Sequence, residues 1–174
     1  MYFNPAQMSL ADSAFQHAEK LAGRYFRISP EAMKSHRYDI RTLAYLDRHE
    51  VNSQAFAHLC KYDCHQSDKA GLEQGLHFYR ICLQDNRILD AVGRAGPFIK
   101  LNPLLLYIAA HELVHVIRFD GGCIDFDAPL AEKQREEEKV HDITRDMLSN
   151  LAGQELNLVL ECFSSRYQLG DLYQ

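Results

Sequence analysis

The sequence has no apolar run of the roughly 18 residues that a helix needs to cross a bilayer. Its first residues, MYFNPAQMSLADS, lack the basic start and the apolar segment of a secretory signal peptide. Lys and Arg form no cluster along the chain, and the formal net charge is -5. These absences predict a cytoplasmic protein that binds neither membranes nor nucleic acids.

The cysteines do not form the framework of a small disulfide-rich domain, because their number is odd and their spacing irregular. We interpret them as reduced thiols. Cys60, Cys64 and His65 are closely spaced, but no second pair of ligands accompanies them, so the pattern favours buried free cysteines over a metal site. With 174 residues, 47% of them hydrophobic, the chain is predicted to form one domain over residues 1–174.

The first part of the chain predicts helices followed by a small sheet. Apolar residues recur at helical spacing over 9–23, with Ser9 as the N-cap, and Ser29-Pro30 is typical of a second helix start, although the stretch to Leu43 could continue as helix or strand. Residues 55–64 and 76–92 favour antiparallel strands, with turn residues at 84–87. The fold class is therefore predicted as α+β.

Two long helices are predicted in the second part of the chain. Asn102 and Pro103 provide a cap and a first-turn proline for a helix that ends near residues 120–122. Its apolar side chains point in all directions, so we expect it to be the buried central helix. A second amphipathic helix is predicted over residues 130–151, whereas the residues from Leu156 onward show no clear period.

The central helix carries His111-Glu112-Leu113-Val114-His115. Two imidazoles four residues apart lie on one helical face, where both can bind the same metal ion. A catalytic zinc uses three protein ligands and keeps one position for water, from which a neighbouring carboxylate takes a proton. His111 and His115 are therefore candidate zinc ligands and Glu112 the candidate general base. If these three residues were ordinary core residues, burial of their polar groups on an apolar helix without partners would cost free energy of folding.

This motif on a buried helix, after predicted strands and before a helix with glutamates, resembles the zincin superfamily of metallopeptidases over roughly residues 55–150. The resemblance implies a zincin-like domain with N-terminal helices, a small antiparallel sheet, the buried active-site helix and a following long helix. The metzincin branch does not fit, because Arg118 and Gly121 stand where its Gly and His would be. The gluzincin branch, which takes a glutamate from the following helix, fits better.

The third ligand would then come from Glu136-Glu137-Glu138. Relative to Val140, on the apolar face of that helix, Glu137 falls at about 60°, Glu136 at about -40° and Glu138 at about 160°, which points away from the core. We predict Glu137 as the ligand and Glu136 as second choice, although the usual gluzincin row of Glu-x-x-x-Asp is found only at Glu138.

His141 follows Glu137 by one helical turn and is predicted to belong to the site. It could stabilise an oxyanion, orient a ligand, or replace Glu137 as third ligand. Arg118 is expected on the metal side, where it could bind a substrate carboxylate, but a structural ion pair with Glu136 is the favoured interpretation.

The sequence thus predicts a small zinc metallopeptidase that requires Zn2+ and hydrolyses peptide or protein substrates. By the zincin likeness, the strand edge near residues 76–90 would align an extended peptide. The alternative is a zincin-fold module that binds metal without turnover and serves in regulation or interaction.

Overall fold

The computed structural model describes residues 1–64, 76–151 and 153–163. Within them the chain is a mixture of helices and strands, as the predicted α+β class requires. In chain order the elements are α1 (Pro5–Phe26), α2 (Pro30–Ser35), β1 (Tyr38–Arg41), the 3-10 turns η1 (Leu43–Tyr45) and η2 (Arg48–Glu50), β2 (Ala57–Cys64), β3 (Leu76–Leu83), α3 (Asp85–Ala95), α4 (Leu101–Asp120), α5 (Leu130–Ser149) and α6 (Gln154–Cys162).

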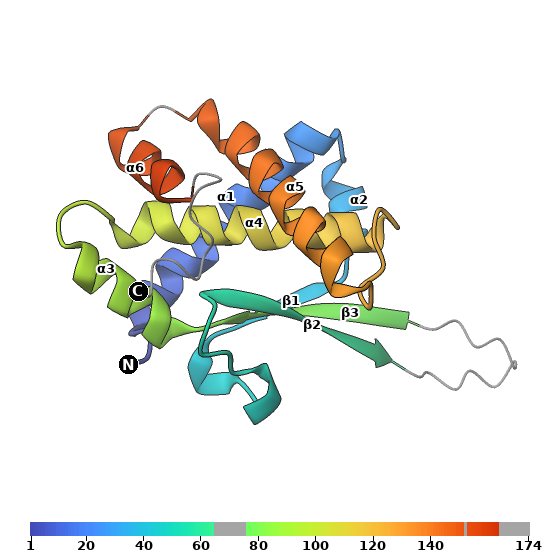
Figure 1. Cartoon of the computed structure of the whole chain (residues 1–174), viewed down its shortest axis with the longest axis horizontal. Coiled ribbons are helices and arrows are strands. Elements are labelled where there is room, and N and C mark those ends of the chain that lie inside the picture. Colours follow the sequence, from blue (N-terminus) through green and yellow to red (C-terminus); the bar gives the residue numbers. More distant parts are fainter. Residues whose placement is uncertain (65–75, 152, 164–174) are drawn as a thin grey trace, which may run out of the picture.

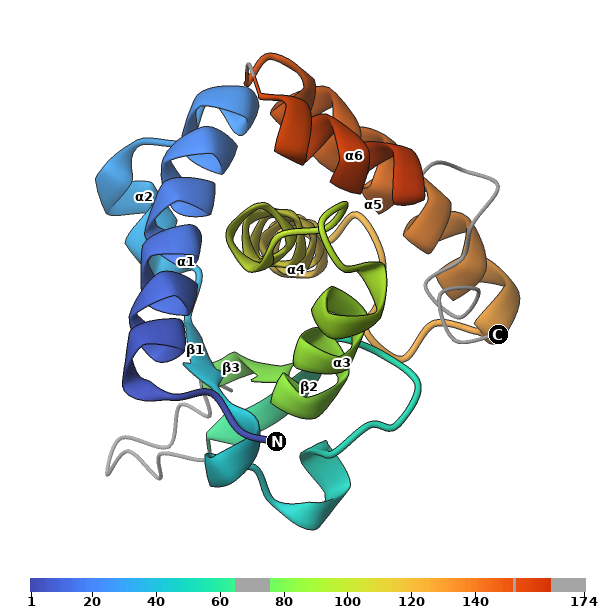
Figure 2. The ribbon, with the colours of Figure 1, turned by 90° about the vertical axis from the view of Figure 1, so that its left-hand side faces the viewer.

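α4 is the central helix, as its sequence predicts. Figure 2 shows it nearly end-on, with α1 and α2 on one side, α5 and α6 on the other, and the sheet with α3 beneath. Every residue from Leu104 to Val114 is buried. α1 packs closely on α4, and most of its buried residues are small: Ala11, Ala14, Ala18 and Ala22 beside the larger Phe15 and Leu21. None of the described helices has both the length and the hydropathy needed to cross a bilayer.

The sheet is mixed, and this corrects the antiparallel prediction. Its strand order is β1-β3-β2, with β3 parallel to β1 and antiparallel to β2 (Figure 1). α2 begins at Pro30 with Ser29 as its side-chain cap, as predicted. The stretch between α2 and Leu43, which the sequence left undecided, contains the strand β1. Since β3 is in the middle, β1 and β2 each have one edge that pairs with no other strand among the described residues, and these are the free edges of the sheet.

The turn predicted at residues 84–87 is wrong, because this segment starts α3 instead of joining two strands. Asp85 is a turn former by type, but it and Gln84 are both buried here and satisfy backbone groups of other segments. The Asp85 carboxylate accepts from the backbone N–H of Phe3 and of Leu43. Ile88, three residues after Asp85, is fully buried in the core. Two buried residues three positions apart lie on one face of a helix, whereas in a strand they would point to opposite faces.

Other element boundaries also differ from the predictions. α1 begins earlier, where Asn4 and not Ser9 is the N-cap and forms a capping box with Gln7. α4 begins at Leu101, so Lys100 occupies the N-cap position predicted for Asn102. α6 forms in a segment that showed no clear period, and its buried residues Leu156, Val159 and Leu160 are spaced as on one helical face.

Candidate metal centre

α4 brings the residues of the motif into the core of the protein. His111 and Glu112 are 3% and 7% exposed, and the His115 side chain is 12% exposed. One helical turn separates the two histidines, so both rings emerge on one face and their Nε2 atoms lie 3.2 Å apart. The two imidazoles therefore converge on one point, as their spacing predicts.

α5 presents its glutamates to α4 because its apolar face is anchored in the core at Val140 and Leu148, both fully buried. This anchor turns Glu138 to solvent, in agreement with the helical projection. Glu136 is buried and Glu137 is partly buried, with 42% of its side chain exposed. Adjacent glutamates thus meet three different environments.

Glu137 lies between the histidines. Its Oε1 is 2.9 Å from Nε2 of His111, and its Oε2 is 3.0 Å from Nε2 of His115. His141, one turn further along α5, brings its own Nε2 to within 3.4 Å of the same Oε1. Three imidazoles and one carboxylate from two helices therefore surround one small volume.

Tyr107 holds the ring of His141 from the other side. Its hydroxyl is 2.6 Å from Nδ1 of His141, which leaves Nε2 of that ring directed at Glu137. Tyr107 is itself fixed by stacking on Phe163, with ring centroids 4.3 Å apart. We did not predict Tyr107 from the sequence, although it stands one turn before His111 in the same helical row.

Glu136 is engaged elsewhere. Arg118 of α4 donates to both of its carboxylate oxygens, through Nε to Oε1 and through Nη2 to Oε2, the latter at 3.1 Å. This is the structural ion pair that the sequence favoured. Because both oxygens are used, Glu136 and Arg118 join α5 to α4 beside the centre, and Glu137 is the glutamate that faces the histidines.

A cavity of about 380 Å³ opens beside the centre. His111, Glu112 and Glu137 line it from one side, and residues 57–59 of β2 line it from another. The strand edge near the site therefore belongs to β2, and the predicted edge at residues 76–90 is wrong, since β3 is paired on both sides.

The free edge of β2 offers backbone groups to this cavity. The N–H of Gln84 donates to the carbonyl of Phe56, so in an antiparallel ladder the even-numbered residues of β2 bond to β3. Ala57 and Leu59 then turn their N–H and C=O groups outward. Both residues line the cavity that also contains Glu112.

The electrostatics of the centre follow from burial and from the carboxylate. Burial lowers the pKa of His111 to about 4. Burial is the largest single influence on His115 and would lower its pKa, but the hydrogen bond to Glu137 and the charges of Glu137, Glu112 and Glu136 together raise it. Burial opposes ionisation of Glu137, yet the neighbouring imidazoles hold its pKa far below the usual range. Burial raises the pKa of Glu112 to about 7.

The spacing of the two ring nitrogens fits a bound cation. Nε2 atoms that bind one tetrahedral zinc at its usual bond length are about 3.3 Å apart, and those of His111 and His115 are 3.2 Å apart. The Glu137 carboxylate lies against both Nε2 atoms, so two imidazoles and a carboxylate, all of them zinc-ligand types, stand at one point.

Four of the five predicted site residues thus meet at the centre, namely His111, His115, Glu137 and His141, while Glu112 lines the adjoining cavity. One ligand atom each from His111, Glu137 and His141 lies within 4.8 Å of the others. Comparison of the chain with protein-family models, with curated proteins and with solved structures finds no match. The chemistry of the centre must therefore be inferred from its own residues.

Proposed function

We propose that this protein is a zinc-dependent hydrolase of the zincin type that cleaves peptide bonds. The observation that carries the proposal is the convergence of His111, His115 and Glu137 on one point, next to a cavity lined by Glu112. Two imidazoles and a carboxylate form the ligand set of several catalytic zinc sites.

His111, His115 and Glu137 would hold the metal. A zinc ion bound there supplies Lewis acidity toward a substrate carbonyl and toward water. Glu112 acts as the general base: its carboxylate takes a proton from the attacking water while a bond forms between the water oxygen and the carbonyl carbon. When the C–N bond breaks, Glu112 returns this proton to the leaving amine.

The substrate would pair with the free edge of β2. An extended peptide could form ladder hydrogen bonds with the outward backbone groups of Ala57 and Leu59. These residues share the cavity with Glu112, so a peptide bond held on this edge lies beside the general base. The same edge explains why an extended main chain, rather than a compact small molecule, is the substrate class we favour.

Metal content tests the ligand set. Mass spectrometry on protein purified without chelator should find that His115→Ala and Glu137→Ala each lose about one zinc per chain relative to wild type. Glu138→Ala is the matched control, because this glutamate of the same helix is exposed and should keep the wild-type content. Zinc content that is equal in all four proteins would contradict the assignment.

Hydrolysis tests the function separately. Glu112→Gln should abolish cleavage of a library of internally quenched peptides while it keeps the zinc content, since Gln has a similar shape but takes no proton. If wild type loaded with zinc cleaves neither peptides nor simple esters, the centre binds metal without turnover.

A second function, a metal-binding module without turnover, is favoured by His141. Its Nε2 lies 3.4 Å from Glu137, so it could complete a set of four protein ligands. Closed sites with four protein ligands are typical of structural zinc, whereas catalytic sites keep one position open. His141→Ala separates the two functions: it should weaken zinc binding strongly if His141 is a ligand, and affect mainly turnover if His141 acts on the substrate.

A further inference from the structure

We propose that His58, Cys60 and Cys82 form a second zinc site, on the two paired strands β2 and β3. One ligand atom from each of the three residues lies within 4.8 Å of the others. An imidazole and two thiolates are a donor set that favours zinc over the harder Mg2+ and Ca2+. This site shares no ligand with the centre on α4.

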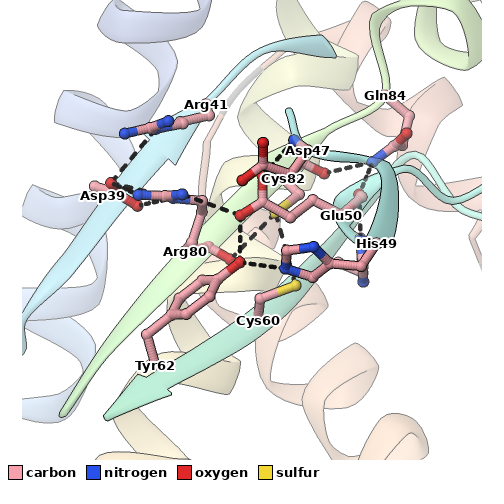
Figure 3. A network of polar contacts seen from close by, with 11 residues as sticks. Asp39, Arg41, Asp47, His49, Glu50, Cys60, Tyr62, Arg80, Cys82 and Gln84 are labelled. Carbon is pink, nitrogen blue, oxygen red and sulfur yellow. Dashed lines mark hydrogen bonds and ion pairs between the residues drawn. The ribbon is translucent and has the colours of Figure 1, made fainter. Parts of the chain in front are cut away.

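The pairing of the strands brings the three side chains to one face of the sheet. His58 lies opposite Cys82 in the ladder, and Cys60 follows His58 by two residues, so all three project to the same side. Ile81 and Leu83, the neighbours of Cys82, point the other way and belong to the hydrophobic core. Figure 3 shows both cysteines facing Glu50 of η2.

The separation of the sulfurs fits a shared metal ion. The two Sγ atoms are 4.0 Å apart, whereas two thiolates on one tetrahedral zinc are separated by about 3.8 Å. A disulfide fits less well, because Cys60 is opposite Arg80 and therefore diagonal to Cys82. The Cα atoms of diagonal pairs are about 7–8 Å apart, beyond the range of ordinary disulfides.

The hydrogen bond of His58 leaves its ring ready to bind a cation. Its Nε2 is 2.6 Å from the backbone carbonyl oxygen of Glu50, which can only accept. Nε2 therefore carries the proton, and in the neutral ring the lone pair is on Nδ1. A backbone carbonyl that fixes the tautomer in this way is the usual partner of a metal-binding histidine.

The surroundings hold this site in place. Glu50 is fully buried and accepts from the guanidinium of Arg80 at 3.0 Å and from the hydroxyl of Tyr62 (Figure 3). Gln84 also donates to the Glu50 carbonyl, at 3.0 Å. The carbonyl that orients His58 is therefore part of a network that fixes η2 to β2 and β3.

Binding of zinc would exchange two thiol protons for one divalent ion, with the protons released to solvent. The ion would join the two strands at the free edge of the sheet. His58 also borders the cavity beside the first centre, so a metal at the second site would fix the edge on which the proposed substrate pairs.

Cobalt(II) spectroscopy and zinc content of the full chain test the proposal. Bound Co2+ should give a thiolate-to-metal charge-transfer band in wild type and in His115→Ala. Cys60→Ser and His58→Gln should each lose this band, and each should also contain about one zinc per chain less than wild type. These two positions are only partly buried, and Gln keeps a donor for the Glu50 carbonyl. Cys123→Ser, at an exposed cysteine, is the matched control and should behave as wild type.

The second site would be supported if Cys60→Ser and His58→Gln lose the band while their far-ultraviolet circular dichroism stays that of wild type, which shows that they are folded. A wild type without the band, a band that survives both substitutions, or a disulfide between Cys60 and Cys82 in freshly purified protein would overturn it. His115→Ala keeps the readout independent of the first centre, so failure of either site can be recognised without the other.

Discussion

The neighbours Glu136 and Glu137 should affect different properties when each is replaced by Ala: stability for Glu136 and zinc content for Glu137. Glu136 is 8% exposed and neutralises Arg118, whose side chain is 15% exposed. Removal of one partner from a buried pair costs about 3–5 kcal/mol, and because Arg118 keeps some contact with water we expect about 3 kcal/mol for Glu136→Ala. With a urea m-value of about 2 kcal/mol/M, the unfolding midpoint should fall by about 1.5 M.

Glu137→Ala should change the unfolding of the metal-free protein far less, by about 1 kcal/mol or below, because 42% of its side chain is exposed. Its loss should instead remove zinc. Urea unfolding in the presence of chelator measures the first effect, and metal content measures the second. Glu138→Ala is the control for both, with a stability within about 0.5 kcal/mol of wild type.

If Glu136→Ala unfolded at the same urea concentration as Glu138→Ala, the ion pair would contribute nothing and the role given to Glu136 would be wrong. Both roles would be wrong if Glu136→Ala lost zinc while Glu137→Ala retained it. In that case the two glutamates would have exchanged roles.

Other substitutions test the support of the site and the packing of the core. If His141 is a zinc ligand, Tyr107→Phe should lower zinc affinity by about 10-fold, since the ring of His141 loses its hydroxyl partner; if His141 acts on the substrate instead, the affinity measured by competition with a chelating dye should stay that of wild type and turnover should fall. Ala18→Leu should cost about 1–3 kcal/mol by overpacking the interface of α1 with α4, measured by thermal unfolding without metal. Glu50→Gln should destabilise the metal-free fold by about 1–2 kcal/mol, because Arg80 loses one of its two anionic partners and keeps Asp39; an unchanged urea midpoint would contradict this.

The placement of the motif could be predicted from the sequence because helical geometry is local. The spacing of His111 and His115 determines that the rings share a face, and the orientation of Glu138 toward solvent follows from the apolar residues after it. Tyr107 was missed because a single tyrosine on an apolar helix carries no signal of its own. Its importance depends on His141, which comes from a different helix.

The small sheet and its surroundings could not be predicted in the same way. Residues 84–87 have turn chemistry, yet Asp85 is buried against the backbone of Phe3 and Leu43, which are remote in sequence. The strand edge was assigned to the wrong strand because strand order depends on long-range pairing. Cys82 and Cys60 likewise meet only through the register of β2 and β3.

Periodicity along single segments was enough to predict the mixed fold class, the buried central helix, the shared face of two histidines and the exposure of Glu138. Which glutamate meets the histidines depends on tertiary contacts, since Glu136 and Glu137 both lie near the apolar side of α5. The two glutamates differ because Arg118 of α4 donates to both carboxylate oxygens of Glu136. A contact between two helices cannot be predicted from the periodicity of either helix alone.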